Sequence, residues 1–527
     1  MATICLRYYT RVIRNASFGY GVNVQTIKAR IPFSVRRFSA VATLGHRYHG
    51  VTVRSRRPEE RALWHDRLSR DRNLLRLQHT ARYSSQSDML EWSPHNFADF
   101  LRENDIQRCY MVWDRTDCKV KVSHPELEPI EKYFAKDKID YDQHEGVFLQ
   151  LGQRTGCLLG AFIWRTNRGQ ACGGVRLWNY TTIEQYLRDG LRLGQGMGVK
   201  SALAGLWAGG GKGVVQVPMA NKHFIQDYRT QIFYDYGDFL SSLNGCYVTA
   251  EDVGVNVHDL DHVHQHTRYT TCIPEEKGGS GNPSIATGKG VVCAMEGALG
   301  FLHMGSLEGK SVAIQGAGNV ATVIVDELIK KRVAQIYVTD CHQFRVDDMR
   351  DLFRHKHGST ELEIKKVPID DTSIMSRQCH ILSPCALGNI LNKDTIPLIN
   401  ADIVCGAANN QLGSPEDNEL LKERGITYVV DYLANRMGIV NCANETYGRL
   451  PNDPAITRHF DTHWENSIIN MTTKILEKAR DDDITPVEAA NAIADKMSRV
   501  LHPIWPNRSQ QIIDALVETE WHKQPTH

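Results

Sequence analysis

The strongest constraint on the fold is a segment in which two apolar strands enclose a glycine turn and a helix. Residues 311–315 and 335–340 have the apolar runs of strands, and a helix is expected over 323–331. Strand, glycine turn, helix and strand make a right-handed βαβ unit. Helix-compatible stretches alternate with further short strands expected at 380–382, 403–405 and 428–430. This alternation predicts an α/β fold with a doubly wound parallel sheet.

The glycine turn of this unit suits a dinucleotide. Its glycines let the turn and the helix N-terminus approach a pyrophosphate, whose charge meets unpaired backbone N–H groups. Asp340 follows the first glycine by 24 residues and ends the second strand, where a carboxylate accepts hydrogen bonds from an adenosine ribose. It would also repel a 2′-phosphate, which favours NAD over NADP, although Arg345 follows closely. The expected NAD-binding residues are Gly316, Ala317, Gly318, Asn319, Val320 and Asp340.

The chain before this unit has a different pattern. Residues 146–152 and 160–165 read as paired strands, and residues 181–193 as a helix with Thr182 as its N-cap. The densest glycine run of the chain, residues 205–213, follows and leads into a strand at 214–217. Because so many glycines cost conformational order, we expect something to approach this backbone closely.

Two lysines, Lys200 and Lys212, lie around the glycine run, and Asp252 follows it. A nucleotide-triphosphatase loop is excluded, because Leu206 occupies its first glycine position and Gly213 its hydroxyl position. A lysine among glycines, near a second lysine, is expected to have its pKa lowered by like charge and burial, and so to act as a base. The alternative is two surface lysines and a capping aspartate.

Charge divides the chain into two parts. Residues 1–58 hold 11 basic residues and no acid, whereas residues 85–527 hold 45 basic and 57 acidic residues. The acidic body excludes a globally basic nucleic-acid binder, and no apolar run is long enough for a membrane span. The Arg- and Ser-rich residues 1–84 predict a leader for the mitochondrial matrix, processed after Arg37-Phe38 or Arg82-Tyr83. A basic arm that binds RNA or anionic lipid is the alternative.

Neither cysteine nor histidine spacing predicts a metal site. The 13 cysteines include no Cys-x-x-Cys pair, so they are expected to be reduced and mostly buried thiols. The cluster His258, His262, His264 and His266 lacks the Glu of His-Glu-x-x-His, and its interleaved acids suit a solvated helix face.

Eight collinear motifs make the chain resemble the Glu/Leu/Phe/Val amino-acid dehydrogenase family over residues 130–500, most of all its leucine and phenylalanine branches. They are Gly173-Gly-x-Arg176, Gly196-Met-x-x-Lys200, Gly209-Gly-Gly-Lys212, Ala250-Glu-Asp-Val-Gly254, Gly278-Gly-Ser-Gly-Asn-Pro-Ser284, Gly316-x-Gly-Asn-Val-Ala321, Ser383-Pro-Cys-Ala-Leu-Gly388 and Ala408-Asn-Asn-Gln-Leu412. The resemblance implies NAD-dependent oxidative deamination of an L-amino acid to a 2-oxo acid, ammonium and NADH by a homo-oligomer.

The resemblance also implies roles for individual residues. Lys200 would bind the substrate carboxylate, Lys212 would activate water, and Asp252 would carry protons to and from the amino group. Asn409 would hold substrate and nicotinamide, and Thr287 would contact the nicotinamide amide.

The side-chain pocket is expected to be apolar. The family's glutamate enzymes place a lysine where this chain has Cys172, so leucine-type, branched-chain substrates are favoured. The expected lining is Cys172, Gly173, Ala250 and Ile439. Aromatic or bulky amino acids remain an alternative, because a methylene or two is worth only about 1–3 kcal/mol.

Two departures from the family bear on the site. Arg436 and Met437 replace small residues near the nicotinamide end and are expected to narrow it, and Arg168 stands where a neutral residue is usual. A noncatalytic amino-acid- or NAD-binding protein obstructed by Arg436 and Met437 is a further alternative.

The expected architecture is two α/β domains with the active site in the cleft between them. A substrate domain spans 85–283, of which 85–128 is an extension outside the family match, and a Rossmann-type NAD-binding domain spans 284–455. Helices in 456–527 are expected to pack back on the first domain.

Overall fold

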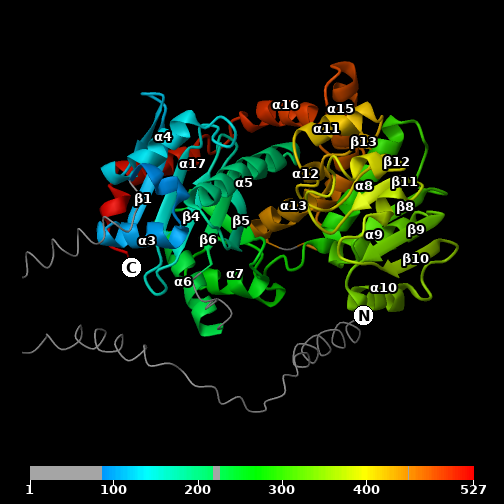
Figure 1. Ribbon diagram of the computed structural model, residues 1–527, viewed down its shortest axis with the longest axis horizontal. Helices are drawn as coiled ribbons and strands as arrows, with labels where there is room; N and C mark the ends of the chain where they lie inside the picture. The colour runs from blue at the N-terminus through cyan, green and yellow to red at the C-terminus, as the bar shows by residue number, and fades with distance from the viewer. Residues whose placement is uncertain (1–85, 218–225, 449, 527) are drawn as a thin grey trace, which may run out of the picture. The chain divides into compact units, whose positions relative to one another are not determined.

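The computed structural model describes residues 86–217, 226–448 and 450–526. The expected leader and both of its processing positions therefore lie outside the described residues. The strands of the described residues form two sheets with helices around them (Figure 1). The predicted α/β fold, with a Rossmann-type domain beside a second α/β domain, is confirmed.

The second sheet is parallel throughout, with the order β10-β9-β8-β11-β12-β13. This is the doubly wound dinucleotide-binding order, and its switch point lies between β8 and β11. Each strand expected from the sequence is present. The strands are β8 (Ser311–Gln315), β9 (Gln335–Asp340), β10 (Glu361–Lys366), β11 (Cys379–Pro384), β12 (Ala401–Val404) and β13 (Thr427–Tyr428).

Strand β10 was not expected, because Ile364 is its one buried residue and most of the others are charged. An edge strand with so little apolar surface leaves no periodic signal in the sequence. The helices that follow these strands or precede the sheet are α8 (Ser284–Phe301), α9 (Asn319–Lys330), α10 (Gln343–Phe353) and α11 (Glu416–Glu423). Helix α9 begins four residues earlier than predicted, directly after Gly318.

The first sheet has seven strands in the order β2-β1-β3-β4-β6-β5-β7. Only β5 pairs in parallel, with β6 and β7 on either side. The expected hairpin of β3 and β4 is present, and residues 108–122 extend the sheet by two strands. The strands are β1 (Arg108–Asp114), β2 (Lys119–Val122), β3 (Gly146–Leu151), β4 (Leu158–Ile163), β5 (Ala171–Trp178), β6 (Gly209–Gln216) and β7 (Tyr247–Glu251).

Residues 209–213 of the glycine run lie in a buried interior strand of this sheet, β6, which begins five residues before the strand expected from the sequence. Helix α5 (Ile183–Leu203), N-capped by Thr182 as predicted, continues ten residues past its expected end. A Cβ on Gly210 would lie 2.9 Å from the Cα of Gly198, so the two backbones are in contact. The close approach predicted for the glycine run is therefore made by a helix of the same chain, and that packing offsets the low helix propensity of the α5 glycines.

The C-terminal segment crosses both domains. Helix α15 (Ile468–Asp481) packs on α8, α16 (Pro486–Ser498) packs on α5, and Trp521 lies against Phe148 of the first sheet. The helices expected in residues 456–527 include α15, α16 and α17 (Arg508–Glu518). The other helices are α3 (Pro94–Glu103), α4 (Glu128–Lys136), α6 (Gln226–Ser242), α7 (Val257–His264), α12 (Asp431–Ala434), α13 (Met437–Asn444) and α14 (Pro454–Thr457).

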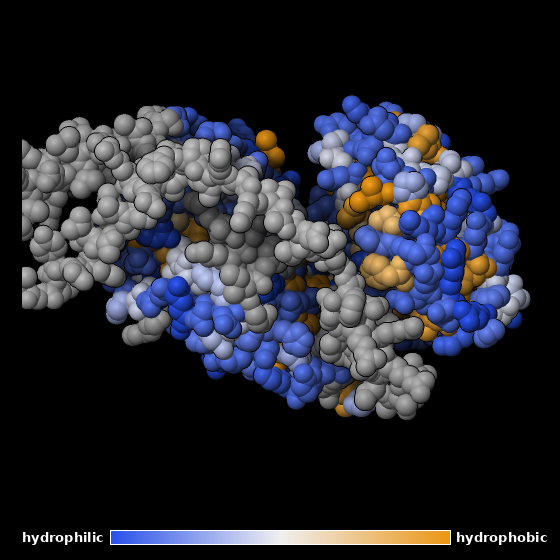
Figure 2. Space-filling view, turned by 60° about the horizontal axis from the view of Figure 1, so that its bottom comes forward, coloured by the Kyte–Doolittle hydropathy of each residue, from blue (hydrophilic) through white to orange (hydrophobic). Residues whose placement is uncertain are grey.

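Hydrophilic residues cover most of the described surface on the face shown in Figure 2. None of the helices in the described ranges has both the length and the apolar character needed to cross a bilayer.

Candidate active site

The first sheet brings three charged residues together at one end. Strand β5 pairs its Val175 with Gly213 of β6 and with Glu251 of β7, so the residues next to these positions become neighbours. The ammonium of Lys212 lies 2.7 Å from Oδ2 of Asp252, and Nε of Arg176 lies 3.0 Å from the same oxygen. Lys212 is only 3% exposed. The structure thus brings together Lys212 and Asp252, the two residues expected to be catalytic, and Arg176 joins them.

Burial controls the protonation of this group. It lowers the pKa of Lys212, against the attraction of Asp252, and the positive charge of Arg176 lowers it further. Burial alone would raise the pKa of Asp252, but Lys212 and Arg176 hold it below the usual value. The sequence predicted a like charge from Lys200; the structure adds Arg176 as a like charge beside Lys212, and Lys200 and Lys212 also repel each other. The arrangement can hold an ionised carboxylate beside an amine that gives up its proton readily.

Lys200 reaches the second domain through an asparagine. Its Nζ donates to Oδ1 of Asn435 at 2.8 Å, and Nδ2 of Asn435 donates to Oδ1 of Asn409 at 2.7 Å. Burial and the charge of Lys212 lower the pKa of Lys200, while Asp431 opposes them. Burial raises the pKa of Asp431, although Lys200 lies close. The sequence analysis assigned a role to Asn409 but none to Asn435 or Asp431. These two residues are more than 200 positions from Lys200 in the chain, so the sequence does not show that they lie beside it.

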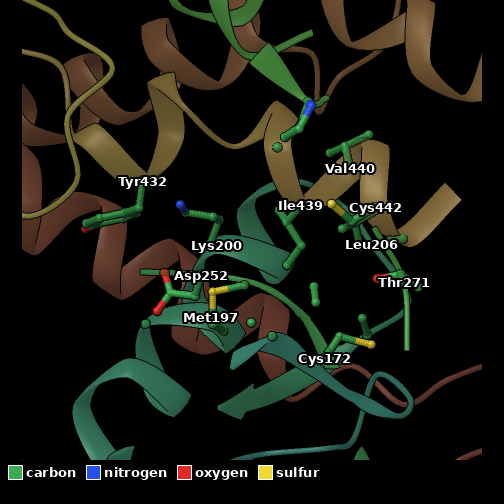
Figure 3. Close-up of a pocket in the computed structure, with 18 of the residues that line it drawn as sticks. Cys172, Met197, Lys200, Leu206, Asp252, Thr271, Tyr432, Ile439, Val440 and Cys442 are labelled. Carbon is green, nitrogen blue, oxygen red and sulfur yellow. The ribbon is translucent and has the colours of Figure 1, made fainter. Parts of the chain in front are cut away.

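A cleft of about 1650 Å³ contains these groups and has an apolar section. The four predicted pocket residues, Cys172, Gly173, Ala250 and Ile439, all line it. The sequence did not identify other lining residues, namely Met197, Leu206, Thr271, Val440 and Cys442 (Figure 3). The helical spacing from Ile439 to Cys442 would have identified the last of these.

The absence of a side chain at Gly173 lets the neighbouring strand of the sheet lie close to it. A Cβ at this position would lie 1.8 Å from the carbonyl oxygen of Gly211, so no side chain fits. Its carbonyl oxygen accepts a hydrogen bond from the Tyr247 hydroxyl at 2.6 Å. Gly173 thus lines the cleft with backbone.

The glycine turn of the second domain leads into a helix whose first backbone N–H groups have no side-chain cap. Gly316 has φ +100°, and Gly318 is the N-cap of α9 with no side-chain cap bond. The first N–H groups of α9 are therefore open to an anion. Asp340 is 6% exposed, and its Oδ2 accepts from the Ala317 N–H at 2.8 Å while Arg345 lies 3.7 Å away. Asn319 and Val320 line the cleft, whereas Gly316, Ala317, Gly318 and Asp340 lie on the adjoining loop and strand end and are not among the lining residues.

Thr287 also lines the cleft, near the start of α8. The Thr287 hydroxyl donates a hydrogen bond to the Pro283 carbonyl oxygen at 3.0 Å. A Cβ on Gly438 would lie 3.5 Å from the Thr287 hydroxyl oxygen. Thr287 of α8 and Gly438 of α13 therefore lie next to one another in the cleft lining.

Arg436 and Met437 do not narrow the cleft, contrary to the sequence-based expectation. Both side chains have no exposed surface and neither lines the cleft. The Arg436 guanidinium donates to the carbonyl of Leu203 at the end of α5 at 2.7 Å, to the Asn466 carbonyl, and contacts His459. Since helix C-termini carry partial negative charge, this arrangement stabilises the buried cation.

Arg168 is structural as well. Its guanidinium donates to the carbonyls of Leu206 and Met497 and stacks on the ring of Trp207. It joins the loop after α5 to helix α16 and does not line the cleft.

The histidine cluster has ordinary polar partners. His266 pairs with Asp238 at 2.7 Å, and His262 packs edge-on against Tyr234. Within the described ranges, Asp340, Cys341 and His342 are the residues close enough to share a cation, and they coincide with the expected ribose position.

Comparison with known proteins agrees with this geometry. Residues 158–269 match the model for the Glu/Leu/Phe/Val dehydrogenase dimerisation domain, and residues 278–501 match that for Glutamate/Leucine/Phenylalanine/Valine dehydrogenase. The chain is 37% identical to leucine dehydrogenase of Geobacillus stearothermophilus over 357 residues, which covers 68% of this chain and 90% of that protein. It is 36% identical to phenylalanine dehydrogenase of Lysinibacillus sphaericus, covering 63% of this chain and 82% of that protein.

A solved structure is similar over the same range. The crystal structure of L-tryptophan dehydrogenase from Nostoc punctiforme is 30% identical, with a TM-score of 0.56, covering 70% of this chain and 97% of that one. These matches confirm the family expected from the motifs. The chain therefore belongs to the Glu/Leu/Phe/Val dehydrogenase family of oxidoreductases that act on amino acids.

Proposed function

We propose that this protein catalyses the NAD-dependent oxidative deamination of an apolar, leucine-type L-amino acid. The products are the 2-oxo acid, ammonium, NADH and a proton. The observation that carries the proposal is the buried contact of Lys212 with Asp252 in the cleft that Lys200 also lines. A pair of this kind can move protons where water is largely excluded.

The residues of the second domain fit a dinucleotide. The uncapped start of α9 offers backbone N–H groups to a pyrophosphate, and the left-handed Gly316 brings the turn close to Ala386. Asp340 ends β9, where a ribose hydroxyl is expected, and its charge disfavours a 2′-phosphate. NAD would supply the hydride acceptor, and Thr287 and Asn409 would orient the nicotinamide.

The chain's own residues would then do the following work. Lys200 holds the substrate carboxylate, with Asn435 fixing its ammonium. Asp252 takes the proton from the substrate amino group, using the oxygen that Lys212 and Arg176 do not contact. Neutral Lys212 takes a proton from the water that attacks the imine carbon, and its charged form stabilises the carbinolamine. Asp252 returns its proton to nitrogen, the C–N bond breaks as the carbonyl forms, and the carbinolamine hydroxyl proton goes to the departing nitrogen, which leaves as ammonium.

The lining supports an apolar substrate. Cys172 stands where a cation would be needed for a side-chain carboxylate, and Met197, Ile439 and Val440 add apolar surface. Leucine-type substrates are favoured by the similarity to leucine dehydrogenase. A dehydrogenase for aromatic or other bulky L-amino acids is the second candidate, which the similarity to L-tryptophan dehydrogenase supports. The alternative of a noncatalytic binding protein assumed that Arg436 and Met437 obstruct the site, and neither residue lines the cleft.

The test uses NADH absorbance with a panel of L-amino acids and the matching 2-oxo acids, on protein lacking residues 1–84. We expect turnover that is highest with branched-chain substrates, and highest turnover with phenylalanine or tryptophan would favour the second candidate. No turnover in either direction would contradict the enzyme proposal.

We also propose import into the mitochondrial matrix and assembly as a homo-oligomer. The acid-free, arginine-rich residues 1–58 support import, and the family model for residues 158–269 is described as a dimerisation domain. A fluorescent protein fused to residues 1–84 should enter mitochondria, and a fusion that remains in the cytosol would contradict this. Light scattering that gives the mass of one chain would contradict the oligomer.

A further inference from the structure

Two thiols meet in the wall of the cleft. The Sγ atoms of Cys272 and Cys442 lie 2.7 Å apart, although 170 residues separate them in the chain. Cys272 is 1% exposed and Cys442 is 9% exposed, and both line the cleft. Figure 3 shows Cys442 near Ile439 and Val440. The proposed deamination makes no use of either sulfur.

A carboxylate holds the two segments together independently of the sulfurs. Oε2 of Glu445, just past the end of α13, accepts hydrogen bonds from the backbone N–H of Cys272 at 2.9 Å and of Ser280 at 2.7 Å. Cys272 has φ +62°, a left-handed conformation that non-glycine residues adopt only where their surroundings impose it. The contact between the sulfurs is therefore part of an anchored junction.

Helix α13 connects the two domain cores. Met437 and Val440 belong to the apolar core of the second domain, whereas Cys442 belongs with Cys272 to that of the first. The same helix carries Ile439, a residue of the substrate pocket. A covalent bond at Cys442 would thus fix, relative to the first domain, the helix that forms one side of the pocket.

We propose that Cys272 and Cys442 are an oxidisable dithiol, and that their conversion to a disulfide by a peroxide lowers turnover reversibly. Each thiol gives up one proton and one electron, a sulfur–sulfur bond forms, the peroxide O–O bond breaks, and hydrogen peroxide leaves as two waters. The sulfurs need to approach only from 2.7 Å to about 2.05 Å. A neutral disulfide suits a desolvated wall better than a thiolate does.

Contact with Cys272 and burial raise the pKa of Cys442 well above its usual range. Cys442 therefore rests as a neutral thiol, and its oxidation by peroxide is expected to be slow compared with that of an exposed thiolate. Excess peroxide and long incubation are accordingly used in the test.

The experiment treats the full chain with hydrogen peroxide or with dithiothreitol, alkylates the remaining thiols and maps the digest by mass spectrometry. We expect one joined peptide containing Cys272 and Cys442, a higher melting temperature because the cross-link restricts the unfolded chain, and at least a threefold fall in kcat/KM that dithiothreitol reverses. Cys272→Ala and Cys272→Ser should lose all three responses. Cys246→Ala, which removes another buried thiol of the first domain core, should keep them.

Three outcomes would overturn the proposal. They are the absence of the joined peptide, a joined peptide with unchanged turnover, and a reversible loss of turnover that persists in both Cys272 variants. The kinetic measurement rests on the proposed function, whereas the cross-link and the melting temperature do not. A joined peptide in a protein that turns over no amino acid would contradict the deamination and still support the dithiol.

Discussion

The two domains use glycine for opposite purposes. In the first domain, Gly198 and Gly210 remove side chains so that α5 and β6 come into contact. In the second, Gly316 and Gly318 shape a turn that leads into the start of α9, where no side chain caps the helix. A glycine run therefore indicates close approach, and its neighbours decide whether the approaching group is a ligand or the protein itself.

The two domains also differ in how the charged groups of the cleft are partnered. Lys212, Asp252 and Arg176 are paired with one another before any substrate arrives, whereas the second domain offers a helix terminus that a ligand must complete. Catalysis by buried, fixed charges depends on that prior arrangement. We therefore expect substitutions of the charged residues in the first domain to change turnover, and substitutions at the glycine turn and Asp340 of the second domain to change cofactor preference.

The largest effect is expected from Lys212→Ala. Removing the amine eliminates proton transfer to and from water, so turnover should fall about 10³-fold or more. NAD binding, measured by titration calorimetry, should remain within a fewfold. Lys474→Ala, an exposed lysine on α15, is the control and should leave both unchanged. If cofactor binding disappears along with turnover in Lys212→Ala, the division of labour between the domains is wrong.

Gly198→Ala should have the next largest effect. Its Cβ would lie 2.3 Å from the Trp164 ring, and this overpacking should cost about 1–3 kcal/mol in the free energy of unfolding. Gly196→Ala, two residues away on the same helix, has nothing within 4 Å and should stabilise the protein by about 0.5–1 kcal/mol. Urea unfolding of both variants measures the difference. Equal stability would mean that α5 does not pack closely on the Trp164 ring at Gly198.

Asp340→Asn should change cofactor preference. Loss of the charge removes repulsion of a 2′-phosphate, while the amide oxygen can still accept from Ala317. We expect the preference for NAD over NADP to fall about tenfold, or roughly 1.4 kcal/mol. Asp347→Asn, an exposed acid on α10, should have no such effect. An unchanged ratio in Asp340→Asn would remove that residue from the ribose site.

The smallest effect expected is a change in pH dependence. Arg176 lowers the pKa of both Lys212 and Asp252, so Arg176→Gln should raise both. Because Lys212 must be neutral to accept a proton, kcat/KM rises with pH through its pKa, and that limb should move to higher pH. A limb that stays in place, or moves to lower pH, would show that Lys212 does not control it. Arg480→Gln, on the exposed part of α15, is the matched control.

The second domain was easier to predict, because each of its strands except β10 is a short apolar run between helices. The first domain was harder, because β5, β6 and β7 are rich in glycine or mix polar and apolar residues, and their pairing joins distant segments. Arg436 shows a related limit. Its sequence position suggested the nicotinamide end, but only packing directs its side chain to Leu203 and away from the cleft.

The sequence by itself determined the family, the βαβ unit and the chemical identity of Lys200, Lys212 and Asp252, because motifs and apolar periodicity are local properties. Tertiary structure alone decided that Arg176 is a further like charge acting on Lys212, and that Asn435 links Lys200 to Asn409. It also brought Cys272 against Cys442 across 170 residues. The physical reason is that the pKa of a group and the contacts of a side chain depend on burial and on distances in space. Those distances are set by strand pairing and by the packing of the two domains.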